Sequence, residues 1–308
     1  MIKTLFLGSN FEALETLKFL NAQKDFKVKG VVTQPDKPIG RYKEVKETLV
    51  KEYALNHNIE VFYTNNEEYK YREILDYLQP ELIVCKSFGE IIPNFALKYP
   101  KYGAINIHFS LLPKYRGAVP IQKAILDGEK KTGISITKMG PNLDEGDILA
   151  QQEIDILPND TNESLRKKLV KKAPSLLIQT LRKWINNEIT PIKQNSSQAT
   201  YCWKSDISKE KAQIFWKEYT ADYIDRLVRA FIPWPVAWTV INGKKVKIFE
   251  VEIIREEPLR PGDFGYDQKN LLIGTRDGVI NVKKLQVEGK KAMNTSEFLK
   301  GTKVVSIQ

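Results

Sequence analysis

The chain has 308 residues, of which 42% are hydrophobic, and this content excludes a disordered chain. The length suffices for one large domain and one small domain. No run approaches the roughly 18 consecutive apolar residues that a membrane-spanning helix needs. The N-terminus, Met1 to Gly8, leads directly into a strand pattern and lacks the layout of a signal peptide. We therefore expect a cytoplasmic protein.

The net charge of +10 is unevenly distributed along the chain. Residues 1–160 hold 21 Lys and Arg against 22 Asp and Glu, residues 161–204 hold nine against two, and residues 205–308 hold 18 against 14. A cationic excess away from a nearly neutral N-terminal part favours a polyanionic partner, because neutralised phosphates supply much of the affinity for nucleic acid. A basic surface that only faces solvent is the alternative that charge leaves open.

The first 150 residues alternate short apolar runs with amphipathic segments, which is typical of βαβ units around a mostly parallel sheet. We expect helices between the strands, and two of them have a clear apolar face, formed by Ala13, Leu14, Leu17 and Leu20 in one and by Leu49, Tyr53 and Ala54 in the other. The strands are expected near residues 2–7, 27–33, 60–63, 82–86, 103–107, 133–139 and 148–156.

The pattern changes after Pro158. Residues 161–164 are typical of a helix start, and residues 163–186 are expected to form one or two basic helices. Further along, one helix at about 219–231 precedes several short strand candidates, which suits a small β-barrel. The strand candidates are separated by the turn dipeptides Asn242-Gly243, Pro261-Gly262 and Asp277-Gly278.

These patterns predict an α/β protein of two domains. The first, over residues 1–188, has a Rossmann-like, mostly parallel sheet. A basic linker over residues 189–204 connects it to a small OB-like β-barrel domain over residues 205–308. Nothing in the sequence indicates an obligate oligomer, so we expect a monomer.

Only two histidines could serve as an acid or base near neutral pH. His57 is expected at the exposed end of a helix. His108 follows an apolar strand candidate, at the edge where open α/β sheets bind ligands. In an extended strand Asn106 and His108 point to the same side, about 6–7 Å apart. An amide beside an imidazole suits carbonyl chemistry; the alternative is that the two residues only fix the following loop.

Three acidic residues lie between the last two strand candidates of the first domain: Asp144, Glu145 and Asp147. Any of them could orient His108, although Glu145 and Asp147 would more often cap the turn or face solvent. Spacing alone does not choose among them. Cys85, within an apolar run, is expected to be a small buried hydrophobe and not a metal ligand.

The run from Asn106 to Gly117, with the distant segment 143–147, resembles the signature of the folate-dependent formyltransferases. A dozen nearly contiguous positions and the acidic motif agree in order and spacing. The resemblance implies that Asn106, His108 and Asp144 are the catalytic residues. It also implies 10-formyltetrahydrofolate as the formyl donor and no metal.

The resemblance also implies a folate site made of two loops. Residues 110–113 match the first loop, and residues 87–93 match the second, in which Phe88 stands where tyrosine is usual. The residues expected at the folate are Phe88, Gly89, Ile91, Ser110, Leu111, Leu112 and Pro113.

Three further segments, 33–41, 229–238 and 285–293, resemble the branch of this family that formylates methionyl-tRNA. They imply transfer of formyl to the amino group of methionine on initiator tRNA, with sugar-nucleotide N-formylation as the alternative. Arg41 matches a basic residue of the loop that contacts tRNA, and Lys43 is expected to join it. Two features depart from the family pattern: Ser9-Asn10 replaces the usual Thr-Pro, and the loop beyond Tyr42 is shorter.

Overall fold

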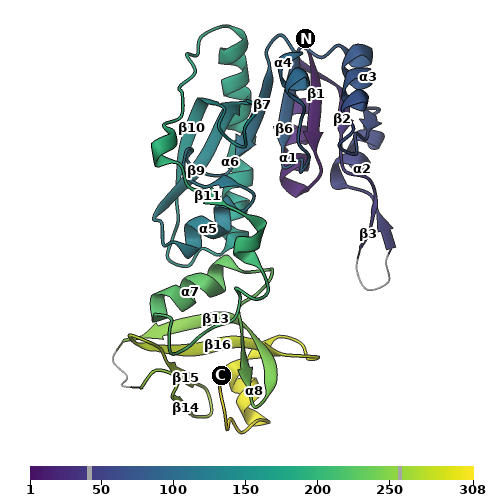
Figure 1. The fold of residues 1–308 in the computed structure, drawn as a ribbon. Coiled ribbons are helices and arrows are strands. Elements are labelled where there is room, and N and C mark those ends of the chain that lie inside the picture. The colour runs from purple at the N-terminus through teal and green to yellow at the C-terminus, as the bar shows by residue number, and fades with distance from the viewer. Residues whose placement is uncertain (40–43, 256–258) are drawn as a thin grey trace. The chain divides into compact units, whose positions relative to one another are not determined.

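The computed structural model describes residues 1–39, 44–255 and 259–308, and it has the predicted α/β class (Figure 1). Two compact units make up the chain, and each is described by itself. The first unit comprises Met1–Gly117, Gly133–Ile154 and Lys167–Tyr201, and the second comprises Ala118–Thr132, Asp155–Arg166 and Cys202–Gln308.

A seven-stranded sheet organises the first unit, with the strand order β10-β9-β7-β6-β1-β2-β5. The central strands are parallel to one another, and β9 runs antiparallel to β7. The prediction of a mostly parallel sheet is therefore confirmed. The strands are β1 (Ile2–Gly8), β2 (Phe26–Val32), β5 (Glu60–Phe62), β6 (Leu82–Lys86), β7 (Ala104–His108), β9 (Lys131–Lys138) and β10 (Asp147–Asp155).

The helices predicted from apolar periodicity form where expected. Helix α1 (Phe11–Asn21) begins at Asn10, whose side-chain oxygen accepts a hydrogen bond from the Ala13 amide at 3.0 Å. Helix α2 (Leu49–Asn56) is capped in the same way by Thr48. The apolar positions Ala13, Leu17 and Leu20 of α1 are fully buried, which explains why the pattern was informative.

One face of the sheet is covered by α3 (Glu68–Leu78) and α4 (Asn94–Lys98). Side chains of Leu5, Ile83 and Ala104 point to this face and pack in one apolar cluster with both helices. Because side chains alternate along a strand, Asn106 and His108 share the face of Ala104. The site residues therefore lie at the rim of this apolar layer.

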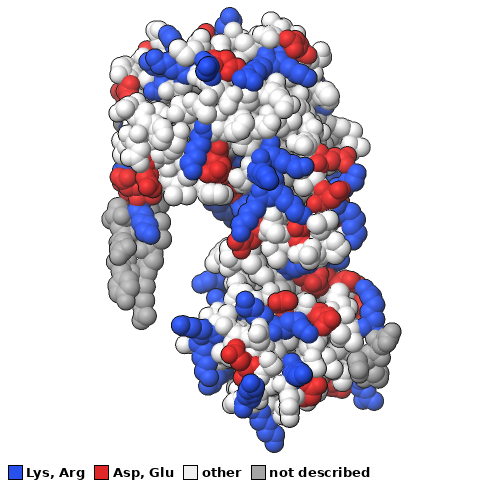
Figure 2. All heavy atoms as spheres, turned by 180° about the vertical axis from the view of Figure 1, so that it is seen from behind, with Lys and Arg blue, Asp and Glu red and all other residues white. Residues whose placement is uncertain are grey.

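Helix α6 (Asn162–Ile185) is a single continuous helix, in agreement with the prediction of one or two helices over 163–186. Its start is fixed by paired hydrogen bonds, since the Ser164 amide donates to the Thr161 hydroxyl and the Thr161 amide to the Ser164 hydroxyl. Most basic residues of the 161–204 region lie on it: Arg166, Lys167, Lys168, Lys171, Lys172, Arg182 and Lys183. Figure 2 shows Lys and Arg at several places on one face of the molecule, with Asp and Glu among them.

The second unit contains α5 (Pro120–Leu126), α7 (Ala221–Ala230) and an antiparallel sheet in the order β12-β13-β16-β15-β14. The predicted helix at 219–231 is thus confirmed as α7. The predicted OB-like domain is confirmed, and its sheet forms an antiparallel half-barrel. The predicted turn Asn242-Gly243 joins β12 to β13, and both residues have positive φ. Its other elements are β12 (Trp238–Ile241), β13 (Lys244–Ile254), β14 (Phe264–Tyr266), β15 (Leu271–Gly274), β16 (Val279–Val287), β17 (Met293–Asn294) and α8 (Thr295–Lys300).

Several short elements escaped prediction. They are the hairpin strands β3 (Lys37–Ile39) and β4 (Glu44–Lys46), the pair β8 (Arg116–Gly117) and β11 (Tyr201–Cys202), and the 3-10 helices η1 (Ser196–Gln198) and η2 (Lys204–Ile207). Arg41 and Lys43, the residues expected at tRNA, lie outside the described residues. Among the described helices, none has the length and apolar character that crossing a membrane requires.

Candidate active site

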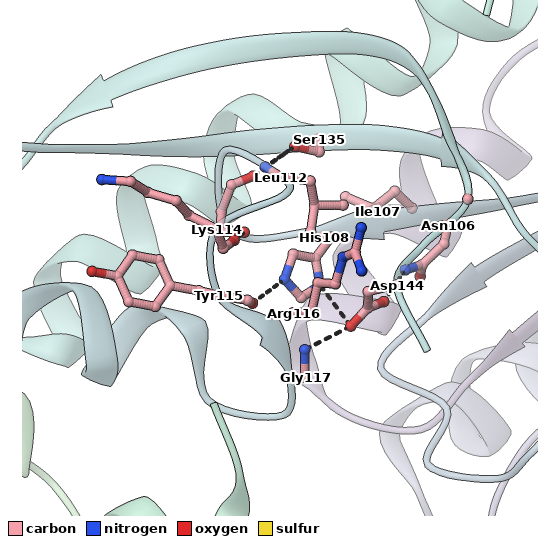
Figure 3. A network of polar contacts seen from close by, with 12 residues as sticks. Asn106, Ile107, His108, Leu112, Lys114, Tyr115, Arg116, Gly117, Ser135 and Asp144 are labelled. Atoms are coloured by element: carbon pink, nitrogen blue, oxygen red, sulfur yellow. Dashed lines mark hydrogen bonds and ion pairs between the residues drawn. The ribbon is translucent and has the colours of Figure 1, made fainter. Parts of the chain in front are cut away.

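The carboxyl end of β7 presents Asn106 and His108 beside β6, at the edge of the sheet where parallel strands end. His108 is 6% exposed, and Asn106 is half-buried. In Figure 3 both side chains point toward Asp144, as the two-residue repeat of a strand predicts.

Asp144 reaches these two residues from the loop between β9 and β10. Its Oδ1 accepts a hydrogen bond from Asn106 Nδ2 at 3.4 Å, and its Oδ2 lies 3.6 Å from His108 Nδ1. The Gly117 amide donates to the same Oδ2 at 2.8 Å. Asp144 itself has φ +51°, a left-handed backbone that costs roughly 1 kcal/mol or more in a residue other than glycine. The surrounding loop must therefore hold it there.

The two ring nitrogens of His108 have different partners. Nε2 lies 2.8 Å from the carbonyl oxygen of Tyr115. A carbonyl can only accept, so Nε2 carries the hydrogen, and Nδ1 of the neutral ring keeps a lone pair on the side of Asp144. Nδ1 is therefore the atom that can take up or release a proton at the site.

Burial lowers the pKa of His108 below its usual value, because a charged ring would lose its hydration. The nearby Asp144 carboxylate and the bond to the Tyr115 carbonyl raise this pKa, and the Lys86 ammonium lowers it. The net effect is a lowered pKa. His108 is consequently neutral at neutral pH and can accept a proton there.

The acidic alternatives to Asp144 have other partners. Glu145 Oε1 lies 2.8 Å from Nη1 of Arg116, which is fully buried, and Glu145 Oε2 accepts from Asn142. The expectation that Glu145 caps the turn or faces solvent is thus incomplete, because it also neutralises a buried cation. Asp147 begins β10. Of the three acids, only Asp144 is placed against both His108 and Asn106.

Sequence reasoning missed Arg116 and Gln194. Arg116 Nε and Nη2 donate to Gln194 Oε1 at 3.1 and 2.9 Å, and Gln194 Nε2 donates to the carbonyl oxygens of Asp144 and Gly146, both at 2.7 Å. Arg116 lies within the family-like run from Asn106 to Gly117, but the sequence assigns it no role. Gln194 lies 78 residues further on, so no local spacing could have paired them.

Lys86, the last residue of β6, was also missed. It is 4% exposed, donates to the Ile107 carbonyl at 3.1 Å, and lies 3.3 Å from the centroid of the Phe109 ring. A lysine at the end of an apolar run signals the strand boundary, but the pattern does not show that its ammonium is buried beside the site.

The loop after β7, which is expected at the folate, is held by hydrogen bonds from side chains of β9 and β10. Ser135 donates to the Ser110 carbonyl at 2.6 Å and accepts from the Leu112 amide at 3.1 Å, and Gln151 donates to the Leu112 carbonyl. The Ser110 hydroxyl donates to the Lys114 carbonyl. Leu111 and Pro113 are half-buried, and the Leu112–Pro113 bond is cis.

The second expected folate loop, 87–93, combines buried and open positions. Phe88 is 4% exposed and packs in the apolar cluster of the sheet, so only its backbone can face a ligand. Gly89 has φ +85° and open space where a Cβ would stand, and Ile91 is 87% exposed. Glu90 fixes the loop by accepting from Gln34 at 2.7 Å and Thr64 at 2.5 Å.

The environments of the remaining candidate residues, His57 and Cys85, indicate structural roles. His57 ends α2, is exposed, and stacks on Tyr53 with ring centroids 3.8 Å apart, as expected. Cys85 is buried, as expected, and burial raises the pKa of its thiol to about 12. Among the described residues there is no group of three or more His, Cys, Asp or Glu that could hold a metal ion.

Comparison with known proteins identifies the family of the chain. The family model described as "Formyl transferase" matches residues 2–181, and the model "Formyl transferase, C-terminal domain" matches residues 206–303. The fold of both parts of the chain is thus that of the formyl transferases.

Full-length relatives narrow the class. A methionyl-tRNA formyltransferase from Caldicellulosiruptor saccharolyticus is 41% identical, with 97% of each chain covered, and one from Bacillus cereus is 39% identical, with 98% and 96% covered. The chain belongs to the methionyl-tRNA formyltransferase family. Among solved structures, an N-formyltransferase from Helicobacter canadensis, in complex with folinic acid and dTDP-3-aminofucose, has a TM-score of 0.69 at 25% identity, covering 92% of this chain and 99% of that one.

Proposed function

We propose that the protein transfers the formyl group of 10-formyltetrahydrofolate to the amino group of methionine on initiator methionyl-tRNA, which gives N-formylmethionyl-tRNA for translation initiation. The observation that carries the proposal is the convergence of Asn106, His108 and Asp144 at the carboxyl end of β7. Full-length relatives of about 40% identity supply the acceptor. A cytoplasmic location belongs to the proposal, because aminoacyl-tRNA is made and used there.

The reaction needs one oxyanion to be stabilised and one proton to be moved. The bond from the formyl carbon to N10 of tetrahydrofolate breaks, the bond to the methionine nitrogen forms, and a proton passes from that nitrogen to the leaving tetrahydrofolate. Asn106 Nδ2 donates a hydrogen bond to the oxygen that gains negative charge. His108 Nδ1 takes the proton of the attacking amine, since the ring is neutral and Nε2 is bound to the Tyr115 carbonyl.

Asp144 has two roles in this proposal. Its carboxylate accepts from Asn106 and from the Gly117 amide, which fixes the direction of the Asn106 amide. It also lies beside His108 Nδ1, so the imidazolium that forms during proton transfer gains a neighbouring negative charge. Asn106 and His108 thus act on the reacting atoms, and Asp144 orients and stabilises both.

The two loops that we assign to the donor fit a ligand recognised through backbone groups. Around Gly89 the backbone is open, and Ile91 offers an exposed apolar side chain. Residues 110–113 are fixed by Ser135 and Gln151, so their backbone is preorganised. We assign Phe88, Gly89, Ile91, Ser110, Leu111, Leu112 and Pro113 to the folate site.

For the tRNA we assign the half-barrel domain and the loop that carries Arg41 and Lys43. We retain the limits 1–188 for the catalytic domain, 189–204 for the connection and 205–308 for the tRNA-binding domain. The positive charge beyond residue 160 supports this assignment, because phosphate contacts by Lys and Arg supply affinity for nucleic acid. Affinity for tRNA should then fall steeply between low and moderate salt.

The test is a formylation assay of the purified full chain. The protein should consume 10-formyltetrahydrofolate when charged initiator methionyl-tRNA is added. The His108→Ala variant should formylate the same tRNA at least about a hundredfold more slowly. A parallel reaction with dTDP-linked amino sugars examines the alternative. Formylation of the sugar and not of the tRNA would replace the proposed acceptor, and formylation of neither would overturn the proposal.

A further inference from the structure

A segment that follows α6 contacts two loops of the site: the loop between β9 and β10, which carries Asp144, and the loop that follows β7 and His108. We call residues 192–201 the strap. At its start, Ile192 and Ile148 exchange two backbone hydrogen bonds, of 2.8 and 2.9 Å, just after the Asp144 loop. Near its end, the Thr200 carbonyl accepts from the Arg116 amide at 2.8 Å, in the loop after β7. The strap therefore connects the loop that carries Asp144 to the loop that follows His108.

Gln194 occupies the middle of this connection. Its amide nitrogen donates to the carbonyl oxygens of Asp144 and Gly146, and its amide oxygen accepts from Nε and Nη2 of Arg116. A glutamine side chain has two donor hydrogens and two acceptor lone pairs, and all four are used. No other side chain of similar length offers the same combination, because glutamate lacks both donors and methionine lacks all four groups.

The guanidinium of Arg116 also binds Glu145, the residue that follows Asp144 in the loop between β9 and β10. Nη1 lies 2.8 Å from Glu145 Oε1 and 3.2 Å from the hydroxyl of Tyr201, which is the last residue of the strap. The Arg116 side chain is fully buried, so these partners replace its hydration. The positions of Asp144, Glu145 and Gly146 are consequently coupled to one rigid, charged group.

The same short stretch, 115–117, orients the catalytic pair. The Tyr115 carbonyl accepts from His108 Nε2, and the Gly117 amide donates to Asp144 Oδ2. The strap fixes this stretch as well, because Thr200 accepts from the Tyr115 amide through its hydroxyl at 2.8 Å. The strap thus holds both the backbone of Asp144 and the stretch 115–117, whose Gly117 amide binds the Asp144 carboxylate.

We propose that the strap is part of the catalytic apparatus, and that Gln194 is a positioning residue that sets the distance between Asp144 and His108. The inference rests on the proposed formyl transfer for its kinetic consequence. It assigns a role to a segment that charge and composition identified only as a linker. Gln194 touches neither reacting atom, and it acts through the backbone of Asp144 and through Arg116.

The first test compares two identical substitutions in the strap. Gln194→Met removes all four hydrogen bonds at nearly constant volume, and Gln198→Met changes an exposed residue of the same segment. Gln194→Met should lower kcat by roughly tenfold to a hundredfold, because an ångström of misplacement costs about that much. KM for the donor and for the tRNA should stay within about twofold, since the side-chain hydrogen bonds of Gln194 go to Arg116, Asp144 and Gly146, which lie outside the loops expected at the folate. Gln198→Met should resemble the parent.

Gln194→Glu separates the two halves of the amide. It keeps an acceptor for Arg116 but has no hydrogen for the carbonyl oxygens of Asp144 and Gly146. If holding the Asp144 backbone is the function of Gln194, this variant should be as slow as Gln194→Met. Recovery of the parent kcat in Gln194→Glu would contradict that part of the inference and leave only a role in binding Arg116.

A second readout needs no substrate. With His57 replaced by Gln, His108 is the single histidine, and its ring titration can be followed by NMR. The Asp144 carboxylate raises the pKa of His108, so a loosened Asp144 should let this pKa fall. Gln194→Met should therefore shift the titration in the same direction as Asp144→Asn, and Gln198→Met should not. The charged groups that act on the ring are Asp144 and Lys86. Cys85 lies close to both of them, and the ion pair of Arg116 and Glu145 adjoins Asp144 in the chain.

The two readouts distinguish failure of the inference from failure of the proposed function. If Gln194→Met and Gln198→Met give the same kcat and the same His108 titration, Gln194 does not position the pair. If the titration moves but no variant, parent included, formylates tRNA, the strap positions the pair and the proposed reaction is wrong. Thermal unfolding of each variant shows whether a lost rate reflects a lost fold.

Discussion

His108 Nδ1 faces Asp144 Oδ2 at 3.6 Å, and this contact joins the end of β7 to a loop more than 30 residues away. The opposite ring nitrogen is held by the Tyr115 carbonyl at 2.8 Å. The ring therefore cannot turn without losing a buried hydrogen bond, and proton transfer is directed to Nδ1. The pH dependence and the response to substitutions follow from this arrangement.

Protonation of His108 should not limit the rate at mildly acidic pH. The proposed mechanism needs neutral His108, and burial lowers the pKa of this residue below the ordinary value of about 6.5. As pH falls, the ring remains neutral until this lowered pKa is reached. Once the rate is corrected for the fraction of the methionyl α-amine that is unprotonated (pKa about 7.7), the acid limb of kcat/KM should therefore lie below pH 6.5. A profile of kcat/KM between about pH 5 and 8 measures the limb. A limb above pH 6.5 would show that a different group titrates.

Removal of any member of the catalytic trio should lower kcat without unfolding the protein. We expect losses of at least about a hundredfold for Asn106→Ala, His108→Ala and Asp144→Asn, because each removes a group that acts on charge in the transition state. His57→Ala is the matched control, since His57 is exposed at the end of α2. Single-turnover formylation and thermal unfolding supply the measurements. Near-parent turnover in two of the three variants would refute the assignment.

Much of the first unit could be predicted because its signals are local. Buried parallel strands give continuous apolar runs, and the seven predicted strands agree with the structure to within a few residues. The shared face of Asn106 and His108 followed from the two-residue repeat of a strand. The short hairpin of β3 and β4 was missed, because its three-residue strands do not lie in an apolar run, whereas β5 lies in the longer run from Ile59 to Tyr63.

The rest of the site depends on contacts between distant segments. Spacing could not choose Asp144 over Glu145, because a loop has no periodic direction for its side chains. An arginine in a polar loop, such as Arg116, suggests an exposed cation until its buried partners are known. Gln194 lay in a segment interpreted as a linker, and only the fold shows that its amide reaches both catalytic loops.

Lys86 should lower the pKa of His108, and its removal should reverse this effect. Its ammonium is buried at the end of β6, bound to the Ile107 carbonyl and next to the Phe109 ring. Lys86→Met removes the positive charge, so the His108 ring should protonate more readily. The acid limb of kcat/KM should then move to higher pH. Lys98→Met, at the exposed end of α4, is the control, and equal profiles for both variants would exclude the effect.

Glu90 should control affinity for the folate donor. Its carboxylate accepts from Gln34, Thr64 and the Asn66 amide, and it thereby fixes the loop that we assign to the folate. Glu90→Gln places an amide where three donors converge, at a cost of about 1–1.5 kcal/mol, or roughly tenfold in affinity. KM for the donor should rise, and KM for tRNA should not. Glu73→Gln, exposed on α3, is the control, and an unchanged donor KM in Glu90→Gln would contradict the prediction.

Gly146 should tolerate no side chain. A Cβ at this position would lie 2.0 Å from the Lys138 carbonyl oxygen, so the backbone after Asp144 would have to move. Gly146→Ala should destabilise the protein by about 1–3 kcal/mol in urea unfolding. It should also lower kcat at least about tenfold, because Gln194 binds the carbonyl of this residue. The matched change Gly140→Ala meets only the Gly146 Cα at 4.0 Å and should do neither. If neither Gly146→Ala nor Gly140→Ala changed kcat, the position of the Asp144 loop would not depend on the close approach of Gly146 to the Lys138 carbonyl.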